Sequence, residues 1–298
     1  MRATRLRHAP RTDQYPTAPA DGRLSARPFG PVAFALAHRF ELNRHLAAVH
    51  DILEHVDALL DSERFDDYGP NGLQVPGRPQ VDVVATGVSA HRELFERAAS
   101  AGAGLVLVHH GLFWDRAPRS LSPTLAARLR ILLERDMNLA AYHLPLDAHP
   151  EIGNNALIAE GLGCARGEPF GSHRGMAIGV RAAFPDGGLP AEQLFARVEG
   201  LTGRRPLVFD AGPELVRSIG IVSGGGAGSL GEAVQAGLDA FLTGEPAEPA
   251  LEEAREAGIH FVAAGHYATE TFGIRRLGDM VAERFDVEHR FIDVPNPV

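Results

Sequence analysis

The sequence contains no lysine, so all 29 of its Lys/Arg residues are arginines. This absence excludes a Walker-type phosphate-binding loop, a Schiff-base lysine and a lysine acting as a catalytic base. Cysteine is nearly absent as well, because Cys164 is the single one. One cysteine excludes an intramolecular disulfide and a zinc cluster built on thiolates. It is typical of a reducing compartment, so we expect a cytoplasmic location.

Long apolar runs are also missing. No stretch reaches the ~18 apolar residues that a membrane span requires, so we expect no membrane partner. The 298 residues are 45% hydrophobic and 22% charged, as in ordinary globular proteins. A chain of this length suits one large domain or two lobes.

Positive charge is scarce outside the first forty residues. The net charge is −9, although residues 1–40 contain seven arginines against two aspartates. The remaining body is therefore strongly acidic, which argues against binding along a nucleic-acid backbone. Residues 1–42 are rich in Arg and Pro and show no usable periodicity, and we expect them to form a disordered or loosely attached extension.

Strand and helix patterns alternate through the rest of the chain. Residues 43–60 have the apolar spacing of an amphipathic helix. Buried-strand runs alternate with helical segments after that, which predicts an α/β fold with mixed, mostly parallel sheets in two lobes, residues 43–170 and 171–298. The expected strands cover 81–88, 104–108, 137–144, 176–184, 218–222, 240–243 and 260–264, and the expected helices 92–101, 125–135, 191–201, 230–236 and 250–257.

Two adjacent histidines, His109 and His110, end the apolar run 104–108. Ligands bind at the carboxyl ends of parallel strands, and Gly111 permits the turn that would let both imidazoles face one ligand. Neutral imidazole is the commonest protein ligand for metals. The alternative is that backbone hydrogen bonds satisfy both rings.

Two more expected strand ends carry residues of the same kind. Asp147 follows the strand 137–144, and His266 and Glu270 follow the strand 260–264 with the i, i+4 spacing of one helix face. These residues and the two histidines could meet in one crevice, where three imidazoles and two carboxylates are enough for two metal ions. The alternative is that Asp147 and Glu270 cap helices and pair with arginines.

Further candidates lie beside these positions. His143 is either an additional ligand or an orienting group, and Glu245 is either an acid or base near the metals or a helix cap. Trp114 packs a pocket wall or stacks on a base. The glycine run 223–228 forms a phosphate cradle or a tightly packed turn. We expect structural or exposed roles for His149, His173 and His260.

Together these segments resemble the NIF-three-like family, whose bacterial members are commonly labelled GTP cyclohydrolase I type 2 homologues. The likeness runs from about Asp51 to Val298. The segments that carry it are Asp67-Tyr68-Gly69-Pro70-Asn71-Gly72-Leu73-Gln74-Val75, His109-His110-Gly111-Leu112-Phe113-Trp114, Tyr142-His143-Leu144-Pro145-Leu146-Asp147, Gly153-Asn154-Asn155, Thr243-Gly244-Glu245 and Gly265-His266-Tyr267-Ala268-Thr269-Glu270.

The resemblance implies a toroidal homohexamer with a dinuclear metal centre in each subunit, in the crevice between the lobes. Mixed histidine and carboxylate ligation suits two divalent ions of Zn, Fe, Mn or Ni. The sequence departs from the family pattern at Pro246, where Val or Ile is more typical. By motif, the resemblance assigns the metal ligands to His109, His110, Asp147, His266 and Glu270.

The family label further implies metal-dependent opening of the guanine imidazole ring of GTP. In a reaction of this kind we expect Glu245 or His143 to move protons. A metal pair supports other hydrolytic reactions too, so a phosphatase or phosphodiesterase is an alternative. A third possibility is a ring-shaped interaction protein that binds metal without catalysis.

Overall fold

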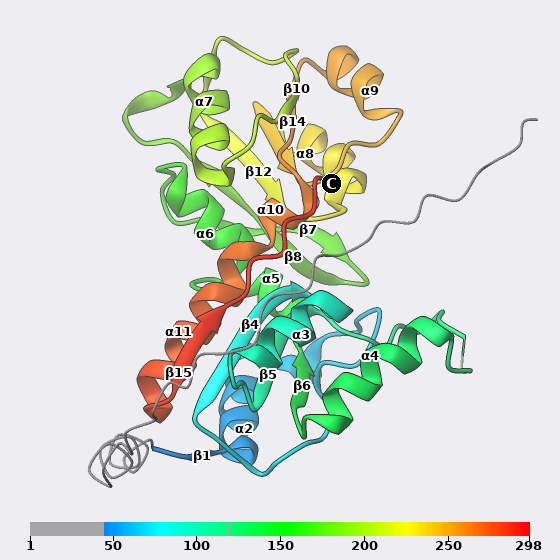
Figure 1. The fold of residues 1–298 in the computed structure, drawn as a ribbon. Helices are drawn as coiled ribbons and strands as arrows, with labels where there is room; N and C mark the ends of the chain where they lie inside the picture. The colour runs from blue at the N-terminus through cyan, green and yellow to red at the C-terminus, as the bar shows by residue number, and fades with distance from the viewer. Residues whose placement is uncertain (1–44, 119) are drawn as a thin grey trace, which may run out of the picture. The chain divides into compact units, whose positions relative to one another are not determined.

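The computed structural model describes residues 45–118 and 120–298, so the predicted extension, residues 1–42, lies outside the described part of the chain. The architecture is mixed α/β, as the alternation of patterns predicts. Two large sheets organise it, one of five strands and one of six (Figure 1). Among the described residues, no helix is long and apolar enough to cross a membrane.

The five-stranded sheet has the strand order β15-β4-β5-β6-β2. Its first four strands are mutually parallel, and β2 pairs with β6 in the antiparallel sense. The carboxyl ends of β4, β5 and β6 therefore lie at one edge. The strands are β2 (Gly72–Val75), β4 (Val83–Ser89), β5 (Leu105–His110), β6 (Asn138–Ala141) and β15 (Glu288–Phe291).

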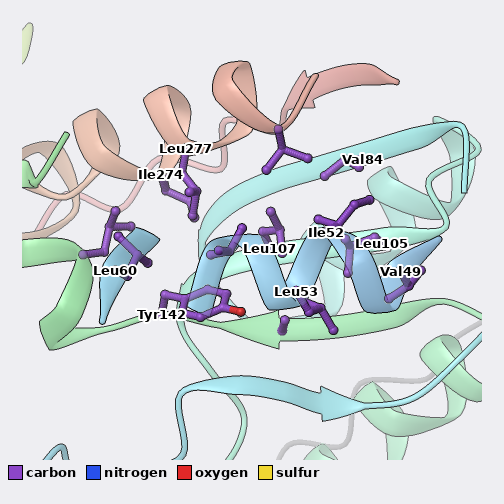
Figure 2. Packing of buried hydrophobic residues seen from close by; sticks show 14 of the residues in the cluster. Val49, Ile52, Leu53, Leu60, Val84, Leu105, Leu107, Tyr142, Ile274 and Leu277 are labelled. Carbon is purple, nitrogen blue, oxygen red and sulfur yellow. The ribbon is translucent and has the colours of Figure 1, made fainter. Parts of the chain in front are cut away.

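Helices cover both faces of this sheet because its strands are apolar on both sides. Leu105 and Leu107 of β5 face α2 (Val49–Leu60) and α11 (Thr271–Phe285), as Figure 2 shows. Val106 and Val108 belong to the core on the other face, beneath α3 (Arg92–Ser100) and α4 (Pro123–Glu134). This alternation is the period of two expected for a strand. Each fully buried Leu or Val side chain contributes roughly 1.5–3 kcal/mol to folding.

The six-stranded sheet has the order β10-β14-β13-β12-β8-β7. Only β12, β13 and β14 run parallel, so this sheet is more mixed than expected. Helices α6 (Asn154–Gly161) and α7 (Ala191–Thr202) pack on one face, and α8 (Leu230–Gln235) and α9 (Ala250–Ala257) on the other. The strands are β7 (Glu168–His173), β8 (Met176–Ala183), β10 (Leu207–Phe209), β12 (Ser218–Val222), β13 (Ala240–Thr243) and β14 (His260–Ala263).

Smaller elements complete the chain. Two short antiparallel pairs join β1 to β3 and β9 to β11. These elements are β1 (Ala47–Ala48), β3 (Gln80–Val81), β9 (Leu189–Pro190) and β11 (Leu215–Val216), the helices α5 (Leu144–Ala148) and α10 (His266–Thr269), and the 3-10 turns η1 (Ser62–Arg64), η2 (Pro185–Gly187) and η3 (Gly226–Ser229).

Some predicted boundaries are corrected. The strand expected over 137–144 ends at Ala141, because α5 already begins at Leu144. The helix expected from residue 43 starts at Val49, after β1. The structure also places a strand, β7, across the boundary expected between residues 170 and 171, where no strand is predicted. Strand β15, from the expected second lobe, pairs with β4 and so completes the sheet of the first.

Candidate metal centre

The strand ends deliver the predicted side chains to one place. His109 and His110 end β5, and Asp147 lies in α5, which follows β6. His266 begins α10 directly after β14, and Glu270 lies where α10 passes into α11. Since α11 runs from the end of β14 onto the face of the five-stranded sheet, it brings Glu270 to the histidines of β5 (Figure 1).

Glu270 is the carboxylate around which three imidazoles gather. Its Oε1 atom lies 3.1 Å from Nε2 of His266 and 3.5 Å from Nε2 of His109. Its Oε2 atom lies 3.1 Å from Nε2 of His110. The residue is only 2% exposed, so these contacts are made away from solvent.

Asp147 approaches the same cluster from α5. Its Oδ2 atom lies 3.5 Å from Nε2 of His109. Its other oxygen, Oδ1, accepts hydrogen bonds from the side chains of Asn154 (2.8 Å) and Ser223 (3.0 Å). One oxygen is therefore held by the protein, and the other remains directed at the imidazoles.

A fourth histidine, His143, lies beside these side chains, and its ring centroid is 5.0 Å from that of His109. The metal-type cluster below consists of His109, His110, His143, Asp147, His266 and Glu270. Each of its histidines uses Nδ1 for a protein partner, which leaves Nε2 directed away from that partner. A second group that fixes the ring is the usual arrangement for a histidine that binds metal through its other nitrogen. The Nδ1 contacts are His109 with the Tyr142 carbonyl (3.1 Å), His110 with Ser89 Oγ (3.1 Å), His143 with Asp67 Oδ1 (2.7 Å) and His266 with Glu245 Oε1 (2.5 Å).

Two buried atoms of the cluster have no hydrogen-bond partner. They are Nε2 of His109 and Oε2 of Glu270. The 3.1 Å approach of His110 to Glu270 is thus a close contact without hydrogen-bond alignment. Leaving such atoms unsatisfied costs about 1–3 kcal/mol each. A cation would satisfy both, and the donor set of imidazole nitrogen and carboxylate oxygen fits divalent transition metals.

The electrostatics of the cluster also favour positive charge. Burial alone would lower the pKa of His109, but the carboxylates of Asp147 and Glu270 raise it to about 9. His266 behaves in the same way, because Glu270 and Glu245 outweigh its burial and raise its pKa to about 9. For His110 burial prevails and lowers the pKa, with His109 and His143 adding to that effect.

Two sets of donor atoms lie close enough together to hold a metal ion. One set comes from His109, His110 and His143, and the other from His110, His266 and Glu270. Within each set the atoms lie within 4.8 Å of one another. His110 belongs to both, so the two sets are adjacent.

A glycine makes room for Glu270. A Cβ atom at Gly224 would lie 2.1 Å from Oε1 of Glu270, and the backbone of Gly224 has a φ of +61°. Only glycine suits both conditions. In the run 223–228, Gly224 and Gly226 are thus closely packed, whereas a Cβ atom at Gly225 or Gly228 would meet nothing within 4 Å.

Asp67 and Asn71, the residues that hold His143 in place, are not among the site residues predicted from the sequence. Asp67 accepts hydrogen bonds from the His143 ring and from the backbone N–H of Leu144 (2.9 Å). Asn71 donates to Asp67 (3.0 Å) and accepts from the backbone N–H of His143 (2.9 Å). Burial alone would raise the pKa of Asp67, but the bonds and charge of His143 and the Asn71 amide lower it to about 2.

The cluster opens onto a cavity of about 600 Å³. His110, His143, Asp147, His266 and Glu270 line it, and so does Trp114, whose predicted place in a pocket wall is confirmed. Glu245 reaches the cluster only through His266. The three histidines expected to be structural or exposed lie elsewhere: His149 accepts from the N–H groups of Glu151 and Ile152, His173 contacts Tyr68, and His260 is buried against the carbonyl of Pro213.

Known proteins are similar to this chain in fold and in sequence. A family model described as Duf34/NIF3 (NGG1p interacting factor 3) matches residues 47–297. A Pseudomonas aeruginosa protein named GTP cyclohydrolase 1 type 2 homolog is 45% identical over 251 residues, which cover 84% of this chain and 98% of that protein. Among solved structures, a protein called ybgI, of unknown function, has a TM-score of 0.80 and 39% identity, covering 85% of this chain and 100% of its own.

A second solved structure, TTHA1606 from Thermus thermophilus, has a TM-score of 0.76 and 35% identity and covers 85% of this chain and all of its own. The matched residues, 47–297, include both large sheets and every residue of the metal-type cluster. The expected family is therefore confirmed: this chain belongs to the DUF34/NIF3 family.

Proposed function

We propose that this protein is a metal-dependent hydrolase that acts on a nucleotide and holds two divalent cations at the cluster. The observation that carries this proposal is the orientation of the four histidines, whose Nδ1 atoms are all engaged by the protein. The proposed ligands are His109, His110, Asp147, His266 and Glu270. Bound there, such ions supply Lewis acidity and a water of lowered pKa.

The chain's own groups have distinct proposed roles. Glu245 holds the proton on Nδ1 of His266 and, being half-exposed, can exchange protons with solvent. His143, fixed by Asp67, presents its ring to the cavity beside Trp114, with ring centroids 5.4 Å apart. His143 is therefore placed to act as an acid or base toward a molecule bound in the cavity, whereas Glu245 can exchange protons with such a molecule only through His266.

The nucleotide substrate is supported by the family and by the size of the cavity. Relatives carry the name GTP cyclohydrolase 1 type 2 homolog. A cavity of about 600 Å³ is in the range that binds ligands of this size. The proposed homohexamer is supported by family membership alone.

The test is incubation of the metal-loaded protein with GTP and a panel of other nucleotides, with products identified by mass spectrometry. Ring opening gives a product heavier by one water, whereas a phosphatase gives a shortened nucleotide and inorganic phosphate. Chelator should abolish the reaction and added metal should restore it. If the protein, with both metals bound, leaves every nucleotide unchanged, the hydrolase proposal is wrong and a metal-binding interaction protein remains.

A further inference from the structure

An arginine outside the proposed metal ligands lines the same cavity. Arg128 lies in α4, and its Nε atom is buried without a hydrogen-bond partner. In the described part of the chain, residues 45–118 and 120–298, Arg128 forms no ion pair closer than 4.0 Å and is the only arginine on the cavity wall. The neighbouring Arg130, on the same helix, is exposed and pairs with Glu134 at 3.9 Å.

A buried, unpaired guanidinium N–H is costly in a protein that offers it no acceptor. The carboxylates that share the cavity, Asp147 and Glu270, are engaged by the histidines of the metal-type cluster. The positive charge of Arg128 is therefore available to a ligand. Because guanidinium presents a planar fork of N–H donors, it binds oxyanions such as phosphate particularly well.

His91 adds a second donor to this wall. It is the N-cap residue of α3, where its Nδ1 atom accepts a hydrogen bond from the backbone N–H of Leu94 (3.3 Å). The proton of the neutral ring then resides on Nε2. Burial and the nearby charge of Arg128 lower the pKa of His91, so the neutral form prevails at physiological pH.

We propose that Arg128 and His91 form an anion subsite that binds the phosphate of the substrate while the reacting part lies at the metal-type cluster. The aromatic rings of Trp114 and Tyr68 line the same cavity and offer surfaces on which a base can stack. The identity of the base rests on the proposed function. The phosphate subsite rests on Arg128 and His91 alone.

The single tryptophan gives a specific readout. Trp114 is the only tryptophan in the sequence and lines the cavity, so quenching of its fluorescence reports ligands bound there. The zinc-loaded protein is titrated with guanosine, GMP and inorganic phosphate, and calorimetry provides a second measure of each affinity. None of these measurements requires turnover.

Arg128→Gln should weaken binding of GMP and inorganic phosphate about tenfold or more, as expected for a lost charge-assisted hydrogen bond. Guanosine affinity should stay within about twofold of wild type. Arg128→Lys should recover part of the loss, and the matched control Arg130→Gln should bind all ligands as the wild type does. Unchanged phosphate and GMP affinity in Arg128→Gln, or an equal loss for guanosine, overturns the subsite.

The two proposals fail in different ways. A wild-type protein that binds inorganic phosphate through Arg128 but converts no nucleotide retains the subsite and refutes the hydrolase. If Arg128→Gln turns over GTP at the wild-type rate and binds GMP with unchanged affinity, the hydrolase proposal stands and the subsite is refuted.

Discussion

At the scale of single residues, the site depends on groups that hold its histidines as much as on the histidines themselves. Asp67 is the clearest case, because it is 7% exposed and binds the His143 ring at 2.7 Å. Its pKa is lowered from 3.8 to about 2, so this carboxylate stabilises the fold above pH 3.8. That contribution is lost as the pH falls through about 2.

We expect Asp67→Asn to lower the free energy of unfolding near neutral pH by about 2 kcal/mol, the value that corresponds to this pKa shift. The deficit relative to wild type should stay constant from about pH 7 to about pH 4 and then shrink as the pH falls towards about 2, because the carboxylate is protonated first in the unfolded chain and then in the folded protein. Urea denaturation of the variant and the wild type at several pH values measures this difference in unfolding free energy. Asp66→Asn is the matched control, since Asp66 is exposed and its ion pair with Arg174 should contribute little. A pH-independent deficit would contradict this explanation.

Glu245→Gln separates proton transfer from metal binding. The variant should retain the metal content of the wild type, since Glu245 contacts His266 and not the cavity. Turnover should fall about 100-fold or more if this carboxylate moves protons. Metal analysis and steady-state rates measure the two effects, with the exposed Glu248→Gln as control. Wild-type turnover in Glu245→Gln would show that the assigned role is wrong.

At the scale of elements, the turn after β12 shapes the site. Gly224→Ala should displace Glu270, because the added Cβ would overlap its Oε1 atom and the φ of +61° disfavours alanine. We expect lower metal content and a loss of unfolding free energy of roughly 1 kcal/mol or more. At Gly225 an added Cβ meets nothing within 4 Å, so Gly225→Ala should retain the metal content and the unfolding free energy of the wild type. Full metal occupancy in Gly224→Ala would refute the close-approach argument.

Regular apolar strands and amphipathic helices could be predicted from the sequence. The bounds expected for β12, β13 and α9 agree with the structure, because each is a clear run between turn residues. Strands β2, β7 and β15 were not predicted. β2 begins at a glycine in a turn-rich segment, β7 contains Pro169 and Gly171, and β15 alternates charged residues at a sheet edge. Their strand character comes from pairing, which local patterns do not encode.

The candidate site could be predicted only in part, again because contacts between distant parts of the chain leave no local pattern. Parallel strands bring their carboxyl ends together, so residues that follow strands could be grouped from sequence alone. Asp67 lies 76 positions before His143 and follows no predicted strand. The signals at this position were the segment from Asp67 to Val75, which carries part of the family resemblance, and the proximity of Asp67 and Asn71 in sequence. Arg128 gave none, because an arginine within a helix is ordinarily solvated.

At the scale of the whole molecule, we propose a ring of six subunits, the assembly that the family resemblance implies. Light scattering at micromolar concentration should then give a mass of about six times 31.9 kDa. Dilution and moderate salt should leave the mass unchanged if the interface is an obligate one. A stable monomer would contradict the proposed assembly without affecting the metal-site proposal.

The central claim is that the chain binds two divalent ions at the cluster around Glu270. Anomalous diffraction from crystals of the zinc-loaded protein, recorded on both sides of the zinc absorption edge, tests it most directly. We expect two anomalous peaks per subunit, each within bonding distance of Nε2 atoms of the cluster histidines, and the loss of at least one peak in Asp147→Ala. Anomalous peaks only at sites outside the cluster, or none at all in zinc-loaded crystals, would contradict it.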